Sequence, residues 1–77
     1  MINQRLVEIC AKIFGIKASE VNESITRDDM PEWDSLNHLM FLTEIEKNFG
    51  FRFTASEINT IKSIKDITYI LKAKGHA

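Results

Sequence analysis

The sequence predicts an all-α protein, a small bundle of three main helices and one short helix with a long loop between the first two helices. Apolar residues recur at three- and four-residue spacing in three segments, as they do in helices that bury one face. The alternation of apolar and polar residues that is typical of strands is nearly absent. Because the chain has 77 residues, we expect residues 1–77 to form a single domain.

The first helix is expected over about Asn3–Phe14, and Gly15 is a natural end for it in a left-handed cap. The next segment, Lys17–Trp33, is interpreted as a long ordered loop, since it is polar and Pro31 disfavours helix at the residue before it. A loop of this length in a small domain is often functional. The apolar face of the first helix is expected to contain Ile2, Leu6, Ile9, Cys10 and Ile13, and the loop to be anchored by Ile16, Val21 and Ile25.

The second helix is expected from Ser35 to about Asn48. Asp34 is its N-cap candidate, because a carboxylate can accept from the free N–H groups of a first turn. Gly50 is the expected stop signal. The apolar stripe of this helix is expected to comprise Leu36, Leu39, Met40, Leu42, Ile45 and Phe49.

Two further helices are expected after a short extended piece at Phe51–Phe53. The segment Thr54–Glu57 matches a capping box, which opens a short helix that carries Ile58 and Ile61. Ser63 opens the last helix, from Ile64 to about Lys72, in a similar way. The inward residues of that last helix are expected to be Ile64, Ile67, Ile70 and Leu71.

Bulk properties exclude several classes of function. Ten basic and eleven acidic residues give a net charge of -1, which provides no general attraction to nucleic acid. No apolar run approaches the ~20 residues that span a bilayer, so we expect no membrane insertion. The single cysteine, Cys10, excludes an intramolecular disulfide, favours a cytoplasmic location and is expected to be a buried, inert thiol. No metal-ligand spacing is present, and we expect a monomer.

Ser35 is the candidate functional residue. It follows the long loop and begins the second helix, where free backbone N–H groups and the helix dipole favour a negative group. A phosphate ester on its hydroxyl would therefore be stabilised. Many serines without a special function also occupy the first turn of a helix, so this position alone does not establish a functional role.

The segment Asp34-Ser35-Leu36 resembles the attachment motif of acyl carrier proteins. The similarity extends over nearly the whole chain, through the loop, the Phe49-Gly50 helix end and the Ile64-Lys65-Asp66-Ile67 opening of the last helix. The resemblance implies a non-enzymatic carrier with 4'-phosphopantetheine attached to Ser35, flanked by Asp34 and Leu36, and with acyl or aminoacyl cargo held as a thioester. It also implies a phosphopantetheinyl transferase, a loading ligase and acyl-processing enzymes as partners, docking on Glu32, Leu36, His38, Leu39, Met40 and Glu44.

The chain also departs from the carriers of bulk fatty acid synthesis. Asn37 and His38 follow the motif where a further acid is usual, and Met40 stands where an acid is often found. The segment Trp33–Leu39 resembles carriers of specialised pathways, so fatty acid, polyketide, non-ribosomal peptide, modified-sugar and surface-lipid synthesis all stay open. The acids expected to steer basic partner surfaces are Asp29, Glu32, Asp34, Glu44 and Glu46.

Two residues beside the motif, the function of the whole chain and the role of its apolar interior each allow more than one interpretation. Trp33 is expected to be partly exposed and to brace the loop against the second helix; the alternative is that it contacts the arm or a partner. His38 is expected to be a surface or docking residue rather than a general base. The alternatives for the whole chain are an interaction module without a prosthetic group and a small DNA-binding domain, although Lys47 is the only base of the second helix. Seven apolar residues are expected either to form an ordinary core or to line a space between the helices that shelters an acyl chain: Leu39, Met40, Leu42, Ile45, Phe53, Ile58 and Ile61.

Overall fold

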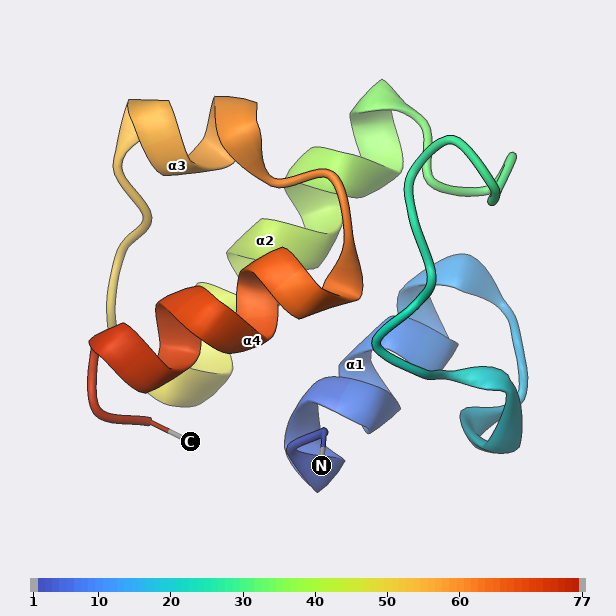
Figure 1. Ribbon diagram of the computed structural model, residues 1–77, viewed down its shortest axis with the longest axis horizontal. Coiled ribbons are helices and arrows are strands. Elements are labelled where there is room, and N and C mark those ends of the chain that lie inside the picture. Colours follow the sequence, from blue (N-terminus) through green and yellow to red (C-terminus); the bar gives the residue numbers. More distant parts are fainter. Residues whose placement is uncertain (1, 77) are drawn as a thin grey trace.

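The computed structural model describes residues 2–76 and contains four α-helices within that range. Between α1 and α2 the chain also forms a single 3-10 turn, η1. No strand occurs in residues 2–76, so the predicted all-α bundle of three main helices and one short helix is confirmed (Figure 1). The elements are α1 (Gln4–Phe14), η1 (Ala18–Glu20), α2 (Ser35–Phe49), α3 (Ala55–Thr60) and α4 (Ile64–Ala73).

The ends of α1 and α2 follow from local sequence. The side chain of Asn3 accepts hydrogen bonds from the backbone N–H groups of Arg5 and Leu6, which caps α1. Gly15 and Gly50 end α1 and α2 with φ of 66° and 72°, a left-handed conformation in which a side chain is strained. Both glycine stop signals are therefore confirmed.

The short helix α3 begins with the expected capping box. Thr54 Oγ1 accepts from Glu57 N–H at 3.0 Å, and Glu57 Oε1 accepts from Thr54 N–H at 2.9 Å. The hydrogen bond from the Thr54 backbone is the main cause that lowers the pKa of Glu57, and the Lys74 ammonium 3.4 Å away lowers it further. This box determines where α3 begins.

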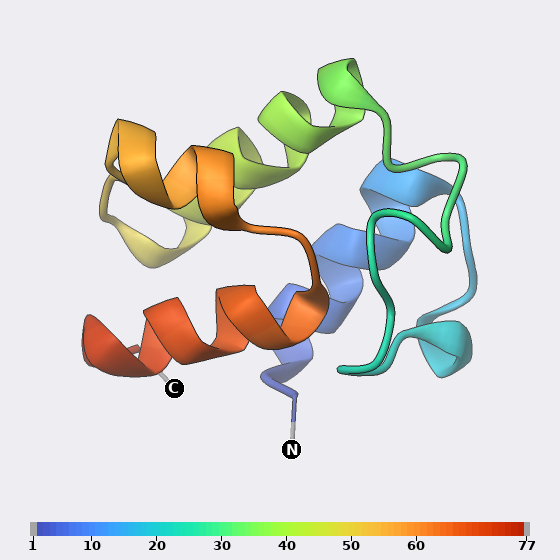
Figure 2. The ribbon, with the colours of Figure 1, turned by 45° about the horizontal axis from the view of Figure 1, so that its top comes forward.

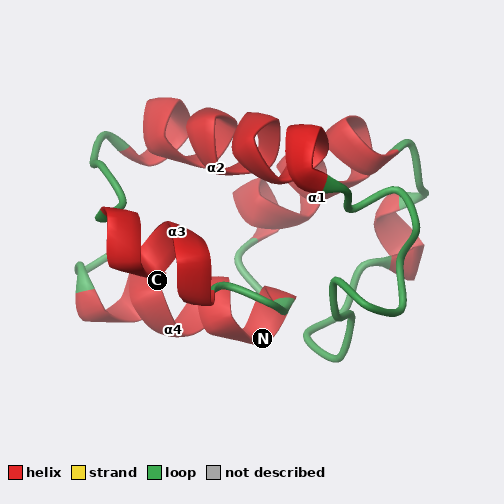
Figure 3. Cartoon of the chain, turned by 90° about the horizontal axis from the view of Figure 1, so that it is seen from above, coloured by secondary structure: helices red, strands yellow, loops and turns green. Residues whose placement is uncertain are grey.

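The long loop, residues 16–34, lies at one end of the bundle, and α3 and α4 lie at the other (Figures 2 and 3). It contains η1, which the sequence did not predict; Glu20 stabilises this turn by accepting from the N–H of Lys17 at 2.9 Å. The loop is joined to the connection between α3 and α4, because Arg27 N–H donates to the Lys62 carbonyl at 2.8 Å. The segment is thus ordered by backbone hydrogen bonds as well as by apolar anchors.

One apolar cluster holds the elements together. At its loop end, the Trp33 ring packs 5.3 Å from Phe14 of α1 and 5.6 Å from Phe41 of α2, measured between ring centroids. Such aromatic pairs add to the stabilisation that burial provides. The buried members of the cluster are Leu6, Ile9, Cys10, Phe14, Trp33, Phe41, Leu42, Ile45, Phe53, Ile61, Ile64, Ile67 and Leu71.

The predicted apolar stripe of α2 is partly wrong. Leu36, Leu39 and Met40 are 67 %, 54 % and 48 % exposed, whereas Phe41, absent from the predicted stripe, is fully buried. Apolar residues occupy nearly every direction around the first turns of α2, so helical spacing alone does not select the inward face. Phe14 was likewise absent from the predicted face of α1, and it is the contact of Phe14 and Trp33 with Phe41 that selects the buried side.

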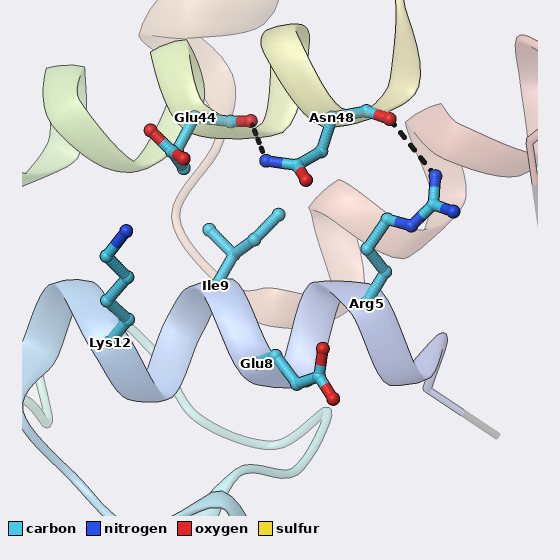
Figure 4. A pocket seen from close by; sticks show the side chains of 6 residues that line it. All are labelled: Arg5, Glu8, Ile9, Lys12, Glu44 and Asn48. Atoms are coloured by element: carbon cyan, nitrogen blue, oxygen red, sulfur yellow. Dashed lines mark hydrogen bonds between the residues drawn. The ribbon is translucent and has the colours of Figure 1, made fainter.

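The seam between α1 and α2 is closed by polar contacts at the far end from Ser35 (Figure 4). Arg5 donates through Nη1 to the Asn48 carbonyl at 3.1 Å, and its guanidinium lies 5.6 Å from the centroid of the Phe49 ring. Between α1 and α2 is a pocket of about 160 Å³, across which Lys12 points toward Glu44, with Ile9 beside them. Its lining has two basic and two acidic residues and therefore no net charge.

The piece between α2 and α3 was expected to be extended, and it has no regular secondary structure. Phe53 N–H donates to the Glu46 carboxylate at 2.7 Å, and the Phe51 and Phe53 rings meet edge to face at 4.8 Å. The segment is therefore held by a side chain of α2 rather than by a neighbouring strand. Within residues 2–76, no helix is both long enough and apolar enough to span a bilayer.

Candidate functional site

Ser35 is the first residue of α2, and its side chain is exposed. Asp34 is the N-cap, as predicted, with its carboxylate accepting from the Asn37 N–H at 2.8 Å. The Asn37 side chain donates in turn to the Glu32 carbonyl at 2.8 Å. The turn that presents Ser35 is therefore fixed by hydrogen bonds on both of its sides.

The first turn of α2 has free donors beside the Ser35 hydroxyl. Among the described residues, none accepts a hydrogen bond from the backbone N–H groups of Ser35 and Leu36. Unpaired N–H groups at a helix start, with the positive end of the helix dipole, favour a phosphate group there. The site fits a phosphate ester on Ser35, since the hydroxyl is exposed and the donors are available.

Trp33 and His38 form a buried bridge from the loop to α3, and we call it the Trp33–His38–Ile58 bridge. The Trp33 indole N–H donates to His38 Nδ1 at 2.9 Å, and His38 Nε2 lies 2.9 Å from the Ile58 carbonyl oxygen. Because Nδ1 accepts, the neutral ring must carry its proton on Nε2, which then donates to Ile58. All polar atoms of the ring are satisfied.

This bridge corrects two expectations. Trp33 was expected to be partly exposed, but it is 2 % exposed; its bracing role is confirmed. His38 was expected at the surface, but it is 5 % exposed, so this prediction was wrong. Both ring nitrogens are engaged, and nothing leaves one free to act as a base on Ser35. The sequence did carry a signal, since Trp33 and His38 occupy the two positions of a hydrophobic staple around the Asp34 cap.

The remaining expected docking residues extend from the Ser35 turn along α2 to its middle. Leu36, Leu39 and Met40 form an exposed group, which we call the apolar patch. Glu32 is exposed, and Glu44 is half-buried at the seam with α1. Leu39 and Met40 of the patch also line a pocket of about 250 Å³, together with Ile13, Thr43 and Glu44.

The residues proposed for sheltering an acyl chain divide into two groups. Leu42, Ile45, Phe53 and Ile61 are buried in the core, and Leu39 and Met40 are exposed. The four buried residues belong to the apolar cluster, and Ile58 is half-buried and packs against it. In this conformation these side chains fill the core, which agrees with the ordinary-core interpretation.

A basic pocket that the sequence did not indicate lies behind Trp33. Arg27, Asp28, Trp33 and Lys62 line a volume of about 390 Å³. The guanidinium of Arg27 donates through Nε to the Trp33 carbonyl at 3.4 Å. Backbone pairing between the loop and the connection that follows α3 brings the two cations together, and no local sequence pattern could reveal it.

The chain offers little other reactive chemistry. Cys10 is fully buried, as predicted, and burial raises the pKa of its thiol to about 11. A thiol with so high a pKa is a poor nucleophile at neutral pH. No group of three or more possible metal ligands occurs among residues 2–76.

Comparison with known families agrees with this geometry. Residues 4–69, which include the whole of the Ser35 site, match the family described as "Phosphopantetheine attachment site". No curated protein matches the chain. Proteins of this family are carriers with a covalently attached 4'-phosphopantetheine group. The match covers well over half of the chain, and the chain therefore belongs to the phosphopantetheine-attachment family of carrier proteins.

Proposed function

We propose that this protein carries acyl or aminoacyl intermediates on a 4'-phosphopantetheine arm attached to Ser35. The observation that best supports this proposal is the exposed Ser35 hydroxyl at the first position of α2, beside two unpaired backbone N–H groups. It lies inside the region that matches the attachment family. The protein itself has no catalytic residue in this proposal.

The chemistry divides between the carrier and its partners. A phosphopantetheinyl transferase joins the Ser35 oxygen to the phosphopantetheine of coenzyme A; the pyrophosphate bond of coenzyme A breaks, and adenosine 3',5'-bisphosphate and the hydroxyl proton leave. The bound arm supplies a thiol that holds the cargo as a thioester. The N–H groups of Ser35 and Leu36 can donate to the phosphate, while the Asp34 carboxylate is kept in place by Asn37. Attachment raises the effective concentration of the cargo at a docked enzyme, to about millimolar for a short flexible link.

We further propose that partner enzymes dock on the apolar patch and on Glu32 and Glu44 beside it. The patch is contiguous with Ser35, and no Asp, Glu, Lys or Arg occurs between residues 35 and 43. Apolar contacts would then hold the partner, and the acids around the patch would steer it, so that association weakens with salt. The expected partners are the transferase, a loading ligase and acyl-processing enzymes. Because His38 is buried, it drops out of the expected docking set.

The pathway is proposed only by class. The segment around Ser35 lacks the acids that are usual in carriers of bulk fatty acid synthesis, and the net charge is only -1. These features favour a carrier of a specialised fatty acid, polyketide or related pathway. The single buried thiol supports a cytoplasmic setting, and a monomeric single domain over residues 1–77 remains our expectation.

The deciding experiment is intact-protein mass after incubation with coenzyme A, Mg²⁺ and a phosphopantetheinyl transferase of broad specificity. We expect one phosphopantetheine-sized gain in the wild-type protein and none in Ser35→Ala. The matched control is Ser56→Ala, which removes an exposed serine from the first turn of α3 and should not affect the gain. A folded wild-type protein that no transferase modifies would favour the interaction module instead, and a gain that persists in Ser35→Ala would place the arm elsewhere.

A further inference from the structure

We propose that His38 is a positioning residue that ties the Ser35 turn to α3 and thereby sets the affinity of the carrier for the enzyme that modifies Ser35. The inference rests on the proposed function, since it concerns the same serine. It assigns to the Trp33–His38–Ile58 bridge a role beyond filling the core. Figure 1 shows the N-terminal half of α2 between the long loop and α3, which is the span that the bridge crosses.

The first argument is the place of the bridge around Ser35. Trp33 is the residue before the N-cap and His38 is the fourth residue of the helix, so the pair encloses Ser35 on both sides. At these two positions many helices have an apolar contact that fixes the angle at which the chain enters the helix. Here the contact is a directed hydrogen bond of 2.9 Å, added to stacked rings whose centroids lie 6.1 Å apart. A directed bond fixes an orientation that an apolar contact leaves free.

The second argument is the dependence of α3 on this bond. The helix α3 has six residues and buries none of them completely. Helices this short are unstable without tertiary contacts. Among the described residues, the hydrogen bond between His38 and Ile58 is the only one that joins α2 directly to α3. His38 therefore restrains the position of α3 relative to the start of α2.

The third argument is that the ring has no freedom to compensate. Nδ1 accepts from Trp33 while Nε2–H donates to Ile58, and the side chain is 5 % exposed. An apolar residue at position 38 would leave a buried indole N–H and a carbonyl without partners, and each would seek water or another arrangement. The simplest relaxation is an outward movement of α3 and of the Trp33–Ser35 turn. The surface that a transferase meets would change, while the chemistry at the hydroxyl would stay the same.

The test compares His38→Leu with His38→Gln in the full chain. Leucine fills the space without bridging, and the glutamine amide has one acceptor and donors with which it can restore the bridge. Three quantities are measured: KM and kcat for the transferase, hydrogen exchange of the α3 amides, and the tautomer of His38 by nitrogen NMR of the wild-type protein. We expect His38→Leu, which removes both hydrogen bonds of the ring, to raise KM by at least about fivefold, the size of one net hydrogen bond, with kcat unchanged. Hydrogen exchange of the α3 amides should become faster in His38→Leu. In His38→Gln, both KM and the exchange rate should lie close to the wild-type values.

A second variant covers the case in which His38→Leu does not fold. Trp33→Phe keeps an aromatic ring against Phe14 and Phe41, although a smaller one, and removes the indole donor. It should raise KM in the same direction. The proposal is overturned if folded His38→Leu, or Trp33→Phe where His38→Leu does not fold, leaves KM at the wild-type value, or if the wild-type ring carries its proton on Nδ1. If the wild-type protein itself accepts no phosphopantetheine, the proposed function fails instead, and this role of His38 fails with it.

Discussion

Both faces of α2 carry large apolar residues, and the two sets lie in opposite environments. The inward face, formed by His38, Phe41, Leu42 and Ile45, is at most 5 % exposed, whereas every member of the apolar patch on the outward face is at least 48 % exposed. Both faces begin at the same cap and the same serine. The inward residues bind the helix to α1, the loop and α3, and the outward residues touch little of the chain itself.

The difference shows what each face is for. Burying a large side chain stabilises a protein by about 1.5–3 kcal/mol relative to leaving it exposed, so exposed leucines beside a reactive group contribute little to stability. Contiguous exposed apolar residues commonly mark an interaction site. The inward face therefore accounts for the fold, and the outward face is free to serve binding. The following experiments separate the two contributions.

The largest difference in the free energy of unfolding is expected between substitutions at two neighbouring residues, one on each face of α2. Phe41→Ala should lower the free energy of unfolding by about 3–5 kcal/mol, because it removes a buried ring from contact with Phe14 and Trp33. Met40→Ala, one residue earlier and 48 % exposed, should change it by less than about 0.5 kcal/mol. Urea unfolding followed by circular dichroism measures both values. Equal losses would show that the two faces are not distinct in solution; Phe41→Leu is available should Phe41→Ala not fold.

The next difference concerns the buried side of α1. Because Cys10 is buried, its reaction with a disulfide reagent at pH 8 should be slowed at least about a thousandfold relative to the unfolded chain. The pKa of this thiol is raised by burial from 9.0 to about 11, so its neutral form is favoured in the folded state. The corresponding stabilisation is complete below pH 9 and is lost as pH rises from 9 to 11.

The control for that loss is Cys10→Ala, whose stability should fall less steeply over the same pH range. In the arm-bearing protein the thiol of the arm should react at once, while Cys10 does not. Immediate reaction of two thiols would contradict the burial of this side of α1.

A smaller effect is expected at the cap that the two faces share. Asp34→Ala should lower the free energy of unfolding by about 1 kcal/mol, because it removes the acceptor for the Asn37 N–H. Asp29→Ala, which removes an exposed acid of the long loop, is the control and should be near neutral. Thermal unfolding of the two variants measures both changes in stability. Equal losses of stability would mean that the cap does not hold the turn.

The smallest effect on stability, and a clear one on binding, is expected at the apolar patch. Leu36→Ser should leave the free energy of unfolding within about 0.5 kcal/mol of wild type, since the side chain is 67 % exposed. It should raise KM in the transferase reaction if partners dock on the patch. Tyr69→Ser removes an equally exposed side chain from α4, far along the chain from Ser35, and should leave KM unchanged. The same KM for both variants would remove the patch from the docking surface.

The extent to which the sequence predicted the molecule can be judged from particular residues. The caps at Asp34, Thr54 and Ser63 and the stops at Gly15 and Gly50 were all predicted, and all are present. They depend on hydrogen bonds and backbone angles within a few residues, which a local pattern specifies. The η1 turn was missed, because its stabilising bond from Glu20 resembles that of many polar loop segments.

The positions of Trp33, His38 and Phe41 could not be read in the same way. Each is buried by a partner from another element: Phe14 of α1 packs on Trp33 and Phe41, and the Ile58 carbonyl of α3 accepts from His38. A tryptophan and a histidine beside a cap are amphipathic side chains, equally suited to a surface or to an interior that satisfies their N–H groups. Helical spacing does not distinguish these outcomes.

Local interactions thus specified where each helix begins and ends and placed Ser35 at the start of α2, since caps and stops act over only a few residues. The packing of α1, the long loop and α3 on α2 decided which side of that helix is buried and left the apolar patch exposed. The physical reason is that burial depends on side chains distant in sequence, which become neighbours only in the folded chain.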